Sequence, residues 1–410
     1  MRRLELLRAV LVVGFLPMGG CSDPPIVVRT VSDRTGLGMA GIRVQVAEQP
    51  WATTDADGKA TFTAVSGKFT VRVHQSITYV PFPADRISVV EGSSGSEVVV
   101  EVDGNFGLLS PPHQPPWYDA DVSGSAVGWT QPTSASTWVQ ISYSGTWLPS
   151  QVASDGSFDL SFPFQAPATA VALRAYEGEP NSPYQLTRLF AFGSATVPVV
   201  KGGHTTGVSV SLQPVVMGTV EGTASLAAPL AGAEVRGWCS IGFGRYEPAP
   251  VIFTETTVVP AGFSLPAASV PGGETWVNLF ATLGGGRGSA RQRRSVSVPA
   301  TGVAFQLPAP AELLEPAEAA FIDGTTVFRW NASETGGTST LGLGCDWTAD
   351  SVLHSVGYSV STTGSQATVP AIPGVAVPAG ASCSWAVNWH ATTSAGERSS
   401  SSAGRTAMAR

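Results

Sequence analysis

Hydrophobic and polar residues alternate in short stretches along much of the chain. Residues 42–46 and 69–73 alternate strictly, and the valine-rich segment 98–102 follows them. A period of two places successive side chains on opposite faces of a strand, which is typical of half-buried strands in a β-sandwich. Turn-forming residues separate the stretches, for example at 55–58 and 66–67. The pattern predicts an all-β chain of tandem antiparallel β-sandwiches.

The composition argues against helical folds. The chain has 410 residues, of which 46 are Gly and 31 are Pro. These residues interrupt helices and strand centres, so a helical bundle, a coiled coil or a doubly wound α/β enzyme is not expected. At roughly 100 to 150 residues per domain, the length predicts three or four domains, each with its own core.

Residues 1–20 have the features of a secretion signal. Three arginines precede an apolar run at 9–17, which is too short to span a bilayer. Residues 18–20 with Cys21 resemble the lipobox of bacterial lipoproteins, which implies acylation of Cys21 and membrane attachment through lipid. Ser22 resembles the outer-membrane sorting pattern. An ordinary signal peptide followed by an accidental cysteine is the alternative.

The charge balance of the mature chain bears on its partners. Removing residues 1–20 deletes three arginines and Glu5, which leaves 20 basic and 29 acidic side chains and a net charge of −9. An acidic chain is not expected to bind nucleic acid. No later segment has 18 uninterrupted apolar residues, so we expect the chain to meet the membrane only through the lipid.

Three cysteines remain after Cys21. Cys345 and Cys383 lie in the last hundred residues, and each stands two positions before a Trp. In an oxidising compartment we expect these two to form a disulfide. Cys239 is then expected to be a buried thiol.

Three motifs in the first unit occur in the order of a known family. Residues 35–44, 54–62 and 65–73 resemble the carboxypeptidase regulatory-like domain, and the match covers residues 26–103. The resemblance implies a transthyretin-like β-sandwich, usually an accessory rather than a catalytic module.

The chain then hints at internal repetition. Residues 104–118 contain four prolines and indicate a stiff linker. The turn and strand at 154–160, and the segment 230–235, parallel motifs of the first unit. We therefore expect sandwiches at 119–213 and 215–308, as related repeats or as other Ig-like domains.

Residues 310–405 differ from the preceding units. Residues 383–391 resemble the penultimate strand of a fibronectin type III domain. A disulfide departs from that family but favours an Ig-like sandwich. Residues 399–410 are expected to be a disordered tail. On the predicted strand at 383–391, every second residue is expected to face the core, namely Cys383, Trp385, Val387 and Trp389.

Motifs for catalysis are sparse. Asp55 and Asp57 could offer oxygen ligands to Ca²⁺, but the later acidic residue of a complete loop is missing, and a hairpin turn with Gly58 at positive φ explains the same residues. The sequence contains no H-E-x-x-H, C-x-x-C or G-x-S-x-G motif. We expect neither an enzyme nor a cofactor.

Two other groups of residues are candidates for ligand binding. The basic cluster at 284–294 could meet phosphates of lipid A or an acidic polysaccharide, or be a solvated hairpin loop. Trp330, Trp385 and Trp389 are in core register. Tryptophans near turns or the linker could stack on sugars. The candidates are Arg287, Arg291, Arg293 and Arg294, with Trp51, Trp117, Trp129 and Trp147.

Together these features predict a lipid-anchored outer-membrane protein, periplasmic or surface-exposed. We expect a row of sandwiches with Pro-rich joints that acts as an adhesion, scaffold or binding module, with loops at the sandwich ends as contact points. Its partner would be another envelope protein or a glycan. The alternatives are a carbohydrate-binding module and, more remotely, a metal-dependent enzyme.

Overall fold

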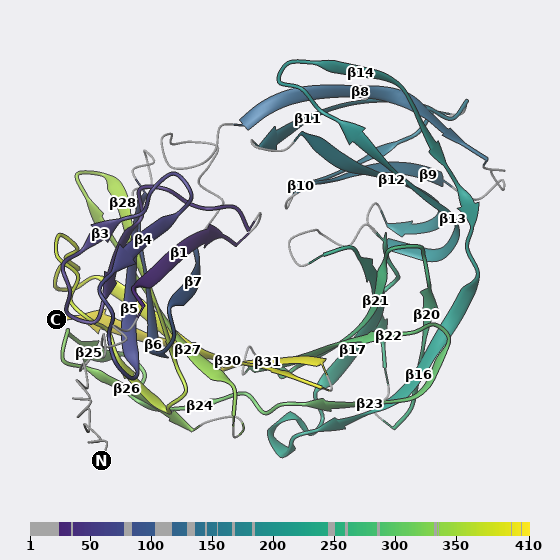
Figure 1. Cartoon of the computed structure of the whole chain (residues 1–410). Helices are drawn as coiled ribbons and strands as arrows, with labels where there is room; N and C mark the ends of the chain where they lie inside the picture. The colour runs from purple at the N-terminus through teal and green to yellow at the C-terminus, as the bar shows by residue number, and fades with distance from the viewer. Residues whose placement is uncertain are drawn as a thin grey trace, which may run out of the picture.

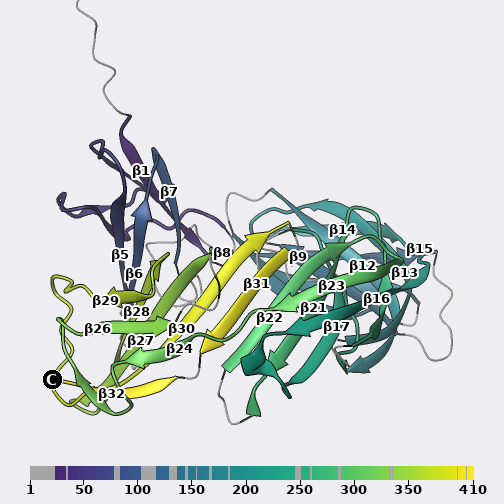
Figure 2. The same ribbon diagram turned by 90° about the horizontal axis from the view of Figure 1, so that it is seen from below.

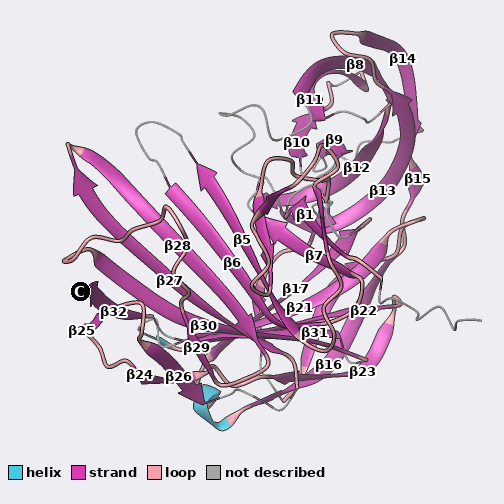
Figure 3. Cartoon of the chain, turned by 60° about the vertical axis from the view of Figure 1, so that its left-hand side comes forward, coloured by secondary structure: helices cyan, strands magenta, loops and turns pink. Residues whose placement is uncertain are grey.

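A computed structural model of the chain describes residues 24–33, 36–77, 84–102, 117–128, 136–143, 146–153, 155–165, 169–182, 185–244, 251–258, 261–284, 288–331, 334, 336–394, 396–402 and 404–410. Nearly all regular structure in these ranges is β-strand, with one short 3-10 turn, η2 (Ala228–Leu230) (Figure 3). The predicted all-β fold class is confirmed. No helix in the described ranges is long and apolar enough to cross a membrane. The signal segment and Cys21 lie outside these ranges.

Unit 1 is a two-layer sandwich. Its smaller sheet has the order β4-β1-β7, and its larger sheet contains β3, β2, β5 and β6. Alternating residues such as Val44, Val46, Val71 and Val73 form the core between the layers. The strands are β1 (Ile26–Ser32), β2 (Arg43–Val46), β3 (Ala52–Thr53), β4 (Lys59–Phe62), β5 (Phe69–Ile77), β6 (Ala84–Ser93) and β7 (Glu97–Val102).

Units 2 and 3 repeat this topology. In each unit the first strand pairs antiparallel with the strand after a central turn, and parallel with the last strand. This common arrangement supports their interpretation as related repeats. Unit 2 contains β8 (Trp117–Val127), β9 (Ser136–Tyr143), β10 (Thr146–Gln151), β11 (Ser157–Gln165), β12 (Ala170–Ser182), β13 (Gln185–Pro198) and β14 (His204–Ser211), followed by β15 (Gln213–Pro214). Unit 3 contains β16 (Met217–Leu226), β17 (Glu234–Gly242), β18 (Val251–Ile252), β19 (Thr256–Thr257), β20 (Phe263–Ala268), β21 (Glu274–Thr282), β22 (Gly288–Val296) and β23 (Ala300–Leu307).

Unit 4 packs the sheet β24-β26-β29 against a sheet that contains β28, β27, β30, β31 and β32. The predicted core stripe on β30 is confirmed, because Cys383, Trp385, Val387 and Trp389 are all buried. The strands are β24 (Glu312–Glu315), β25 (Ala320–Ile322), β26 (Val327–Asn331), β27 (Thr338–Ala349), β28 (Val352–Thr362), β29 (Gln366–Thr368), β30 (Ser382–Thr393), β31 (Gly396–Ser402) and β32 (Arg405–Ala409).

The prediction of a disordered tail at 399–410 is wrong. β31 lies between β30 and β22, and β32 lies between β30 and β25. The serines gave little sign of a strand because they are small and polar. Backbone pairing on both sides needs no large side chain, however, and Ala407 and Ala409 are buried in the unit 4 core.

One 15-stranded sheet runs through units 1, 4 and 3 (Figure 2). β22 of unit 3 pairs antiparallel with β31 of unit 4, from Gly288 opposite Ser402 to Arg293 opposite Glu397. β28 of unit 4 pairs parallel with β6 of unit 1. Unit 4, although last in the chain, therefore lies between units 1 and 3. The predicted Pro-rich linker lies outside the described residues, except for Trp117 and Tyr118 at the start of β8.

Unit 2 is fixed to unit 3 by side chains and backbone. Leu186, Leu189 and Phe192 of β13 are buried in the same cluster as the unit 3 core. The Thr254 amide donates to the Leu186 carbonyl at 2.8 Å. Because the core of unit 3 includes residues of unit 2, the two units cannot separate without exposing apolar surface.

The four units form a curved body (Figure 1). Alternate residues of β28 face opposite sides of the shared sheet. Val356 and Val360 lie in the unit 4 core on one side, and Gly357 and Ser359 line a pocket with residues of unit 1 on the other side. The smaller sheet of unit 1 thus lies inside the curve, and the smaller sheets of units 3 and 4 lie outside it (Figure 1). We call the concave side of the shared sheet the inner face.

Candidate functional site

The inner face between units 1 and 2 is built by residues that stand directly opposite one another on neighbouring strands. Such residues point to the same side of a sheet. On β22, Arg291 and Arg293 point inward, whereas Ala290 and Gln292 are buried on the other side. The rows run Trp238–Asn278–Arg293–Glu397–Thr392, then Arg236–Phe280–Arg291–Ser399–His390–Thr338, then Ser289–Ser401–Asn388–Thr340–Ser361.

Tryptophan and arginine side chains pack together at the unit 3 end of this face. The Arg293 guanidinium carbon lies 3.9 Å from the ring centroid of Trp276, and that of Arg291 lies 5.9 Å from Trp238. Arg291 Nη2 donates to Asn278 Oδ1 at 2.8 Å, and the Asn278 side chain is buried. These five residues are called the Trp–Arg cluster.

The electrostatics of the cluster are set by two adjacent cations. Burial lowers the pKa of Arg291, and the charge of Arg293 lowers it further. Burial also lowers the pKa of Arg293, which the negative charges of Glu397 and Glu274 oppose; a Glu397 oxygen lies 3.9 Å from Arg293 Nη1. The cluster is therefore a partly desolvated positive site on a chain whose net charge is −7.

Small polar side chains cover the middle of the inner face. Asn388 and His390 of β30 are exposed, and Ser399 and Ser401 of β31 are partly exposed. The Ser401 hydroxyl donates to Asn388 Oδ1, and the Thr392 hydroxyl lies 3.4 Å from His390 Nε2. The middle of the inner face, beside the Trp–Arg cluster, is therefore rich in hydroxyl and amide groups.

The structure corrects the interpretation of the basic segment as a solvated hairpin loop. Arg291, Arg293 and Arg294 lie on β22, which is a central strand of the shared sheet. Arg294 stands apart from the cluster, because its Nη1 donates to the Ala304 carbonyl of β23 at 3.4 Å. Arg287 lies outside the described residues.

Sequence reasoning missed Trp238 and Trp276. Both stand at strand positions that face away from the core, since the next residues, Cys239 and Val277, are buried in it. A large aromatic residue in the polar phase was the available signal, and only the pairing of β17, β21 and β22 shows that the two lie beside the arginines.

Three of the four tryptophans predicted as a platform lie in described segments, and these three belong to different units or different sheets. Trp51 packs against the unit 4 core, with the guanidinium carbon of Arg43 5.0 Å from its ring centroid. Trp117 begins β8 in one sheet of unit 2, and Trp147 belongs to β10 in the other. Trp129 lies outside the described residues.

Asp55 and Asp57 lie in a turn. Asp55 Oδ1 accepts from the amides of Asp57 and Lys59 at 2.9 and 2.8 Å. Gly58 has a φ of 76°, and a Cβ there would lie 2.4 Å from the Thr30 carbonyl oxygen, so this turn requires glycine. Within the described ranges, no three His, Cys, Asp or Glu side chains are placed to hold a metal ion together.

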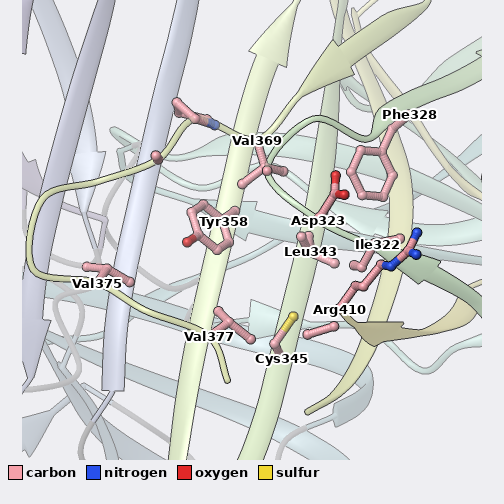
Figure 4. Close-up of a pocket in the computed structure, with 14 residues that line it drawn as sticks. Ile322, Asp323, Phe328, Leu343, Cys345, Tyr358, Val369, Val375, Val377 and Arg410 are labelled. Carbon is pink, nitrogen blue, oxygen red and sulfur yellow. The ribbon is translucent and has the colours of Figure 1, made fainter. Parts of the chain in front are cut away.

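The predicted disulfide between Cys345 and Cys383 is confirmed, and it joins directly opposed residues of β27 and β30. Cys345 lines a pocket of about 210 Å³ in unit 4 (Figure 4). The lining is mostly apolar, with Asp323 and Arg410 as charged members. Cys239 is a free, buried thiol, as expected, and burial raises its pKa to about 12.

A polar network joins units 1 and 4. Arg43 Nη1 donates to His74 Nδ1 at 3.2 Å and to the Pro373 carbonyl of unit 4 at 3.3 Å. His74 Nε2 then donates to Asp85 Oδ1 at 2.8 Å. This hydrogen bond is the largest cause of the lowered pKa of Asp85.

No protein-family model and no curated protein matches the chain. Solved structures with local similarity include the Bacillus anthracis TIE protein, at 11% identity over 70% of this chain and 50% of that one, with a TM-score of 0.16. Another is the minor pilin of Streptococcus agalactiae, at 13% identity over 47% and 97%, with a TM-score of 0.17. A Ca²⁺-stabilised adhesin of an Antarctic bacterium matches at 11% identity over 94% and 98%, with a TM-score of 0.13. The chain thus spans half of the first of these structures, and at such TM-scores none supports a functional argument.

Proposed function

We propose that this chain is a non-catalytic protein of the cell envelope that acts as an adhesion, scaffold or binding module. The observation that carries the proposal is the sheet shared by units 1, 4 and 3. Flexible strings of domains expose loops at their ends, whereas a shared sheet fixes the units relative to one another. The inner face, rather than the loops, is then the contact surface.

Side chains at the unit 3–unit 4 junction support this rigidity. Arg398 of β31 donates from Nε to the Gln306 carbonyl of β23 at 2.9 Å. Its other nitrogens form a bidentate pair with Glu334 at 2.6 and 2.5 Å. The Glu334 pair lies within unit 4 and holds the Arg398 side chain in place. Moving unit 3 away from unit 4 would break the Arg398–Gln306 hydrogen bond together with the β22–β31 backbone pairing, so a hinge at this point is disfavoured.

A carbohydrate-binding module is the more specific form of the proposal. It is favoured by Trp238 and Trp276, because their indoles are partly exposed and lie beside the hydroxyl and amide side chains of the inner face. Lipid attachment through Cys21, an outer-membrane location and a carboxypeptidase regulatory-like identity for unit 1 are further parts of the proposal. They rest on the sequence motifs.

Fractionation and co-sedimentation test the proposal. In a high-salt extract the full chain should partition with membranes, and Cys21→Ser should release it into the soluble fraction. Returned to low salt, the released chain should co-sediment with insoluble envelope material and leave the mass spectrum of envelope glycans and peptides unchanged. Failure to co-sediment with any envelope fraction, or turnover of an envelope component, would refute the proposed role.

A further inference from the structure

We propose that the Trp–Arg cluster and the adjoining rows of the inner face bind a strand of acidic polysaccharide, with sugar rings against Trp238 and Trp276 and a carboxylate on Arg291. This inference rests on the proposed binding function and names its ligand class.

The first step is that the surface is accessible. Arg291 and Glu397 are exposed, as are Asn388 and His390 further along the sheet. The cores of units 3 and 4 lie on the opposite face, and no described element of unit 1 or unit 2 buries these four side chains. An occupant can therefore reach both the cluster and the polar field.

The second step is charge. Arg236, at the edge of the cluster, pairs with Glu234 at 2.9 Å and Glu255 at 3.2 Å. In the described part of the chain, by contrast, Arg291 and Arg293 share a single ion pair, the one with Glu397 at 3.9 Å. Their mutual repulsion favours an additional anion, and a guanidinium fork matches the two oxygens of a carboxylate.

The third step is the chemistry around the charge. Indole rings pack against the apolar C–H faces of sugars, and hydroxyl and amide side chains can exchange hydrogen bonds with sugar hydroxyls. The guanidinium carbon of Arg291 lies 5.9 Å from the Trp238 ring centroid, whereas that of Arg293 lies 3.9 Å from that of Trp276, so Trp238 is less closely covered by arginine. A small anion would contact Arg291 but not the indole, hydroxyl and amide groups, so these groups favour an anion that carries sugar rings.

The fourth step is extent. From β17 to β30 the inner face crosses four strand spacings, or about 20 Å at 4.7 to 4.9 Å per spacing. A surface of this width with two arginines at one end fits an extended, hydroxyl-rich anionic chain. The net charge of −7 opposes any polyanion, so attraction of an anionic chain is expected only locally, at the two arginines.

The test compares oligogalacturonate with neutral cello-oligosaccharide of the same length, titrated into the full chain and followed by calorimetry and tryptophan fluorescence. The acidic oligomer should bind and quench fluorescence, and its affinity should fall with added salt. Arg291→Gln should weaken binding about tenfold through the loss of one charge-assisted contact. Trp238→Ala should weaken it by a similar factor.

Arg329→Gln serves as the matched control, because Arg329 is half exposed on the outer sheet of unit 4 and pairs only with Glu315 in the described part of the chain. It should leave the affinity unchanged, and circular dichroism should show that every variant is folded. Equal binding of acidic and neutral oligomers, or full affinity in both cluster variants, would overturn the inference. Co-sedimentation with envelope material in the absence of oligogalacturonate binding would overturn it while leaving the proposed binding function intact. Co-sedimentation that depends only on envelope protein would do the same.

Discussion

Replacing Arg398 with alanine tests the junction between units 3 and 4. The substitution removes the donor to the Gln306 carbonyl and both hydrogen bonds to Glu334. The Arg398 side chain is 10% exposed, so its loss leaves the Gln306 carbonyl without this donor at a partly buried site. The backbone pairing of β31 with β22 would remain, but its support from β23 would be lost.

The expected magnitude follows from this burial. Removing one partner of a buried ion pair costs about 3 to 5 kcal/mol, chiefly because the other charge stays desolvated. Glu334 is 26% exposed and can regain water, so we reduce the expected loss of unfolding free energy to about 2 to 3 kcal/mol. Arg398→Lys keeps the charge but not the bidentate geometry, and should lie between wild type and Arg398→Ala.

Hydrogen exchange of peptides from β22 and β31, together with urea unfolding, measures the effect. The local readout is preferred because a chain of four units need not unfold in two states. Arg329→Ala is the control, since its pair with Glu315 is 50% and 58% exposed and should contribute less than about 1 kcal/mol. If Arg398→Ala were no more destabilising than Arg329→Ala, or left the hydrogen exchange of the β22 peptides unchanged, the reasoning about this junction would be refuted.

Three further predictions concern single groups. The pKa of Asp85 lies below its ordinary value of 3.8, so its carboxylate stabilises the fold above that pH, and this contribution disappears as the pH falls through the lowered pKa. Thermal unfolding from pH 5 to 2 should show the loss of stability, and Asp85→Asn should abolish this pH dependence. Cys239, with a pKa of about 12, should resist iodoacetamide at pH 8 until denaturant is added, and rapid labelling of the native chain would contradict its burial. The disulfide closes a 38-residue separation, so replacing Cys345 and Cys383 by serine should lower the unfolding free energy of unit 4 by about 4 kcal/mol in calorimetry, and an unchanged transition would contradict this.

Local pattern predicted much of each unit. The alternation of Cys383, Trp385, Val387 and Trp389 predicted one buried face of a strand. All four are buried, and the first three belong to the core of unit 4. Turn chemistry at Asp55 and Gly58 was equally readable, because a single side chain and one positive φ define such a turn. These features depend on neighbours in sequence, which is why sequence reasoning reaches them.

The joining of units could not be predicted in this way. β22 and β31 meet through backbone groups, and their facing residues, such as Arg291 opposite Ser399, have no pattern that specifies pairing. Any strand edge offers the same amides and carbonyls, so the choice depends on the relative placement of whole units. The candidate site was missed for the same reason, because Trp238 and Arg291 come from different strands of unit 3.

Small-angle X-ray scattering from the purified chain tests the central claim most directly. If units 1, 4 and 3 share one sheet, the distance distribution should match the curved body of Figure 1 and remain unchanged between low and moderate salt. A profile with the long maximum dimension of four sandwiches in chain order, moving independently, would contradict the account.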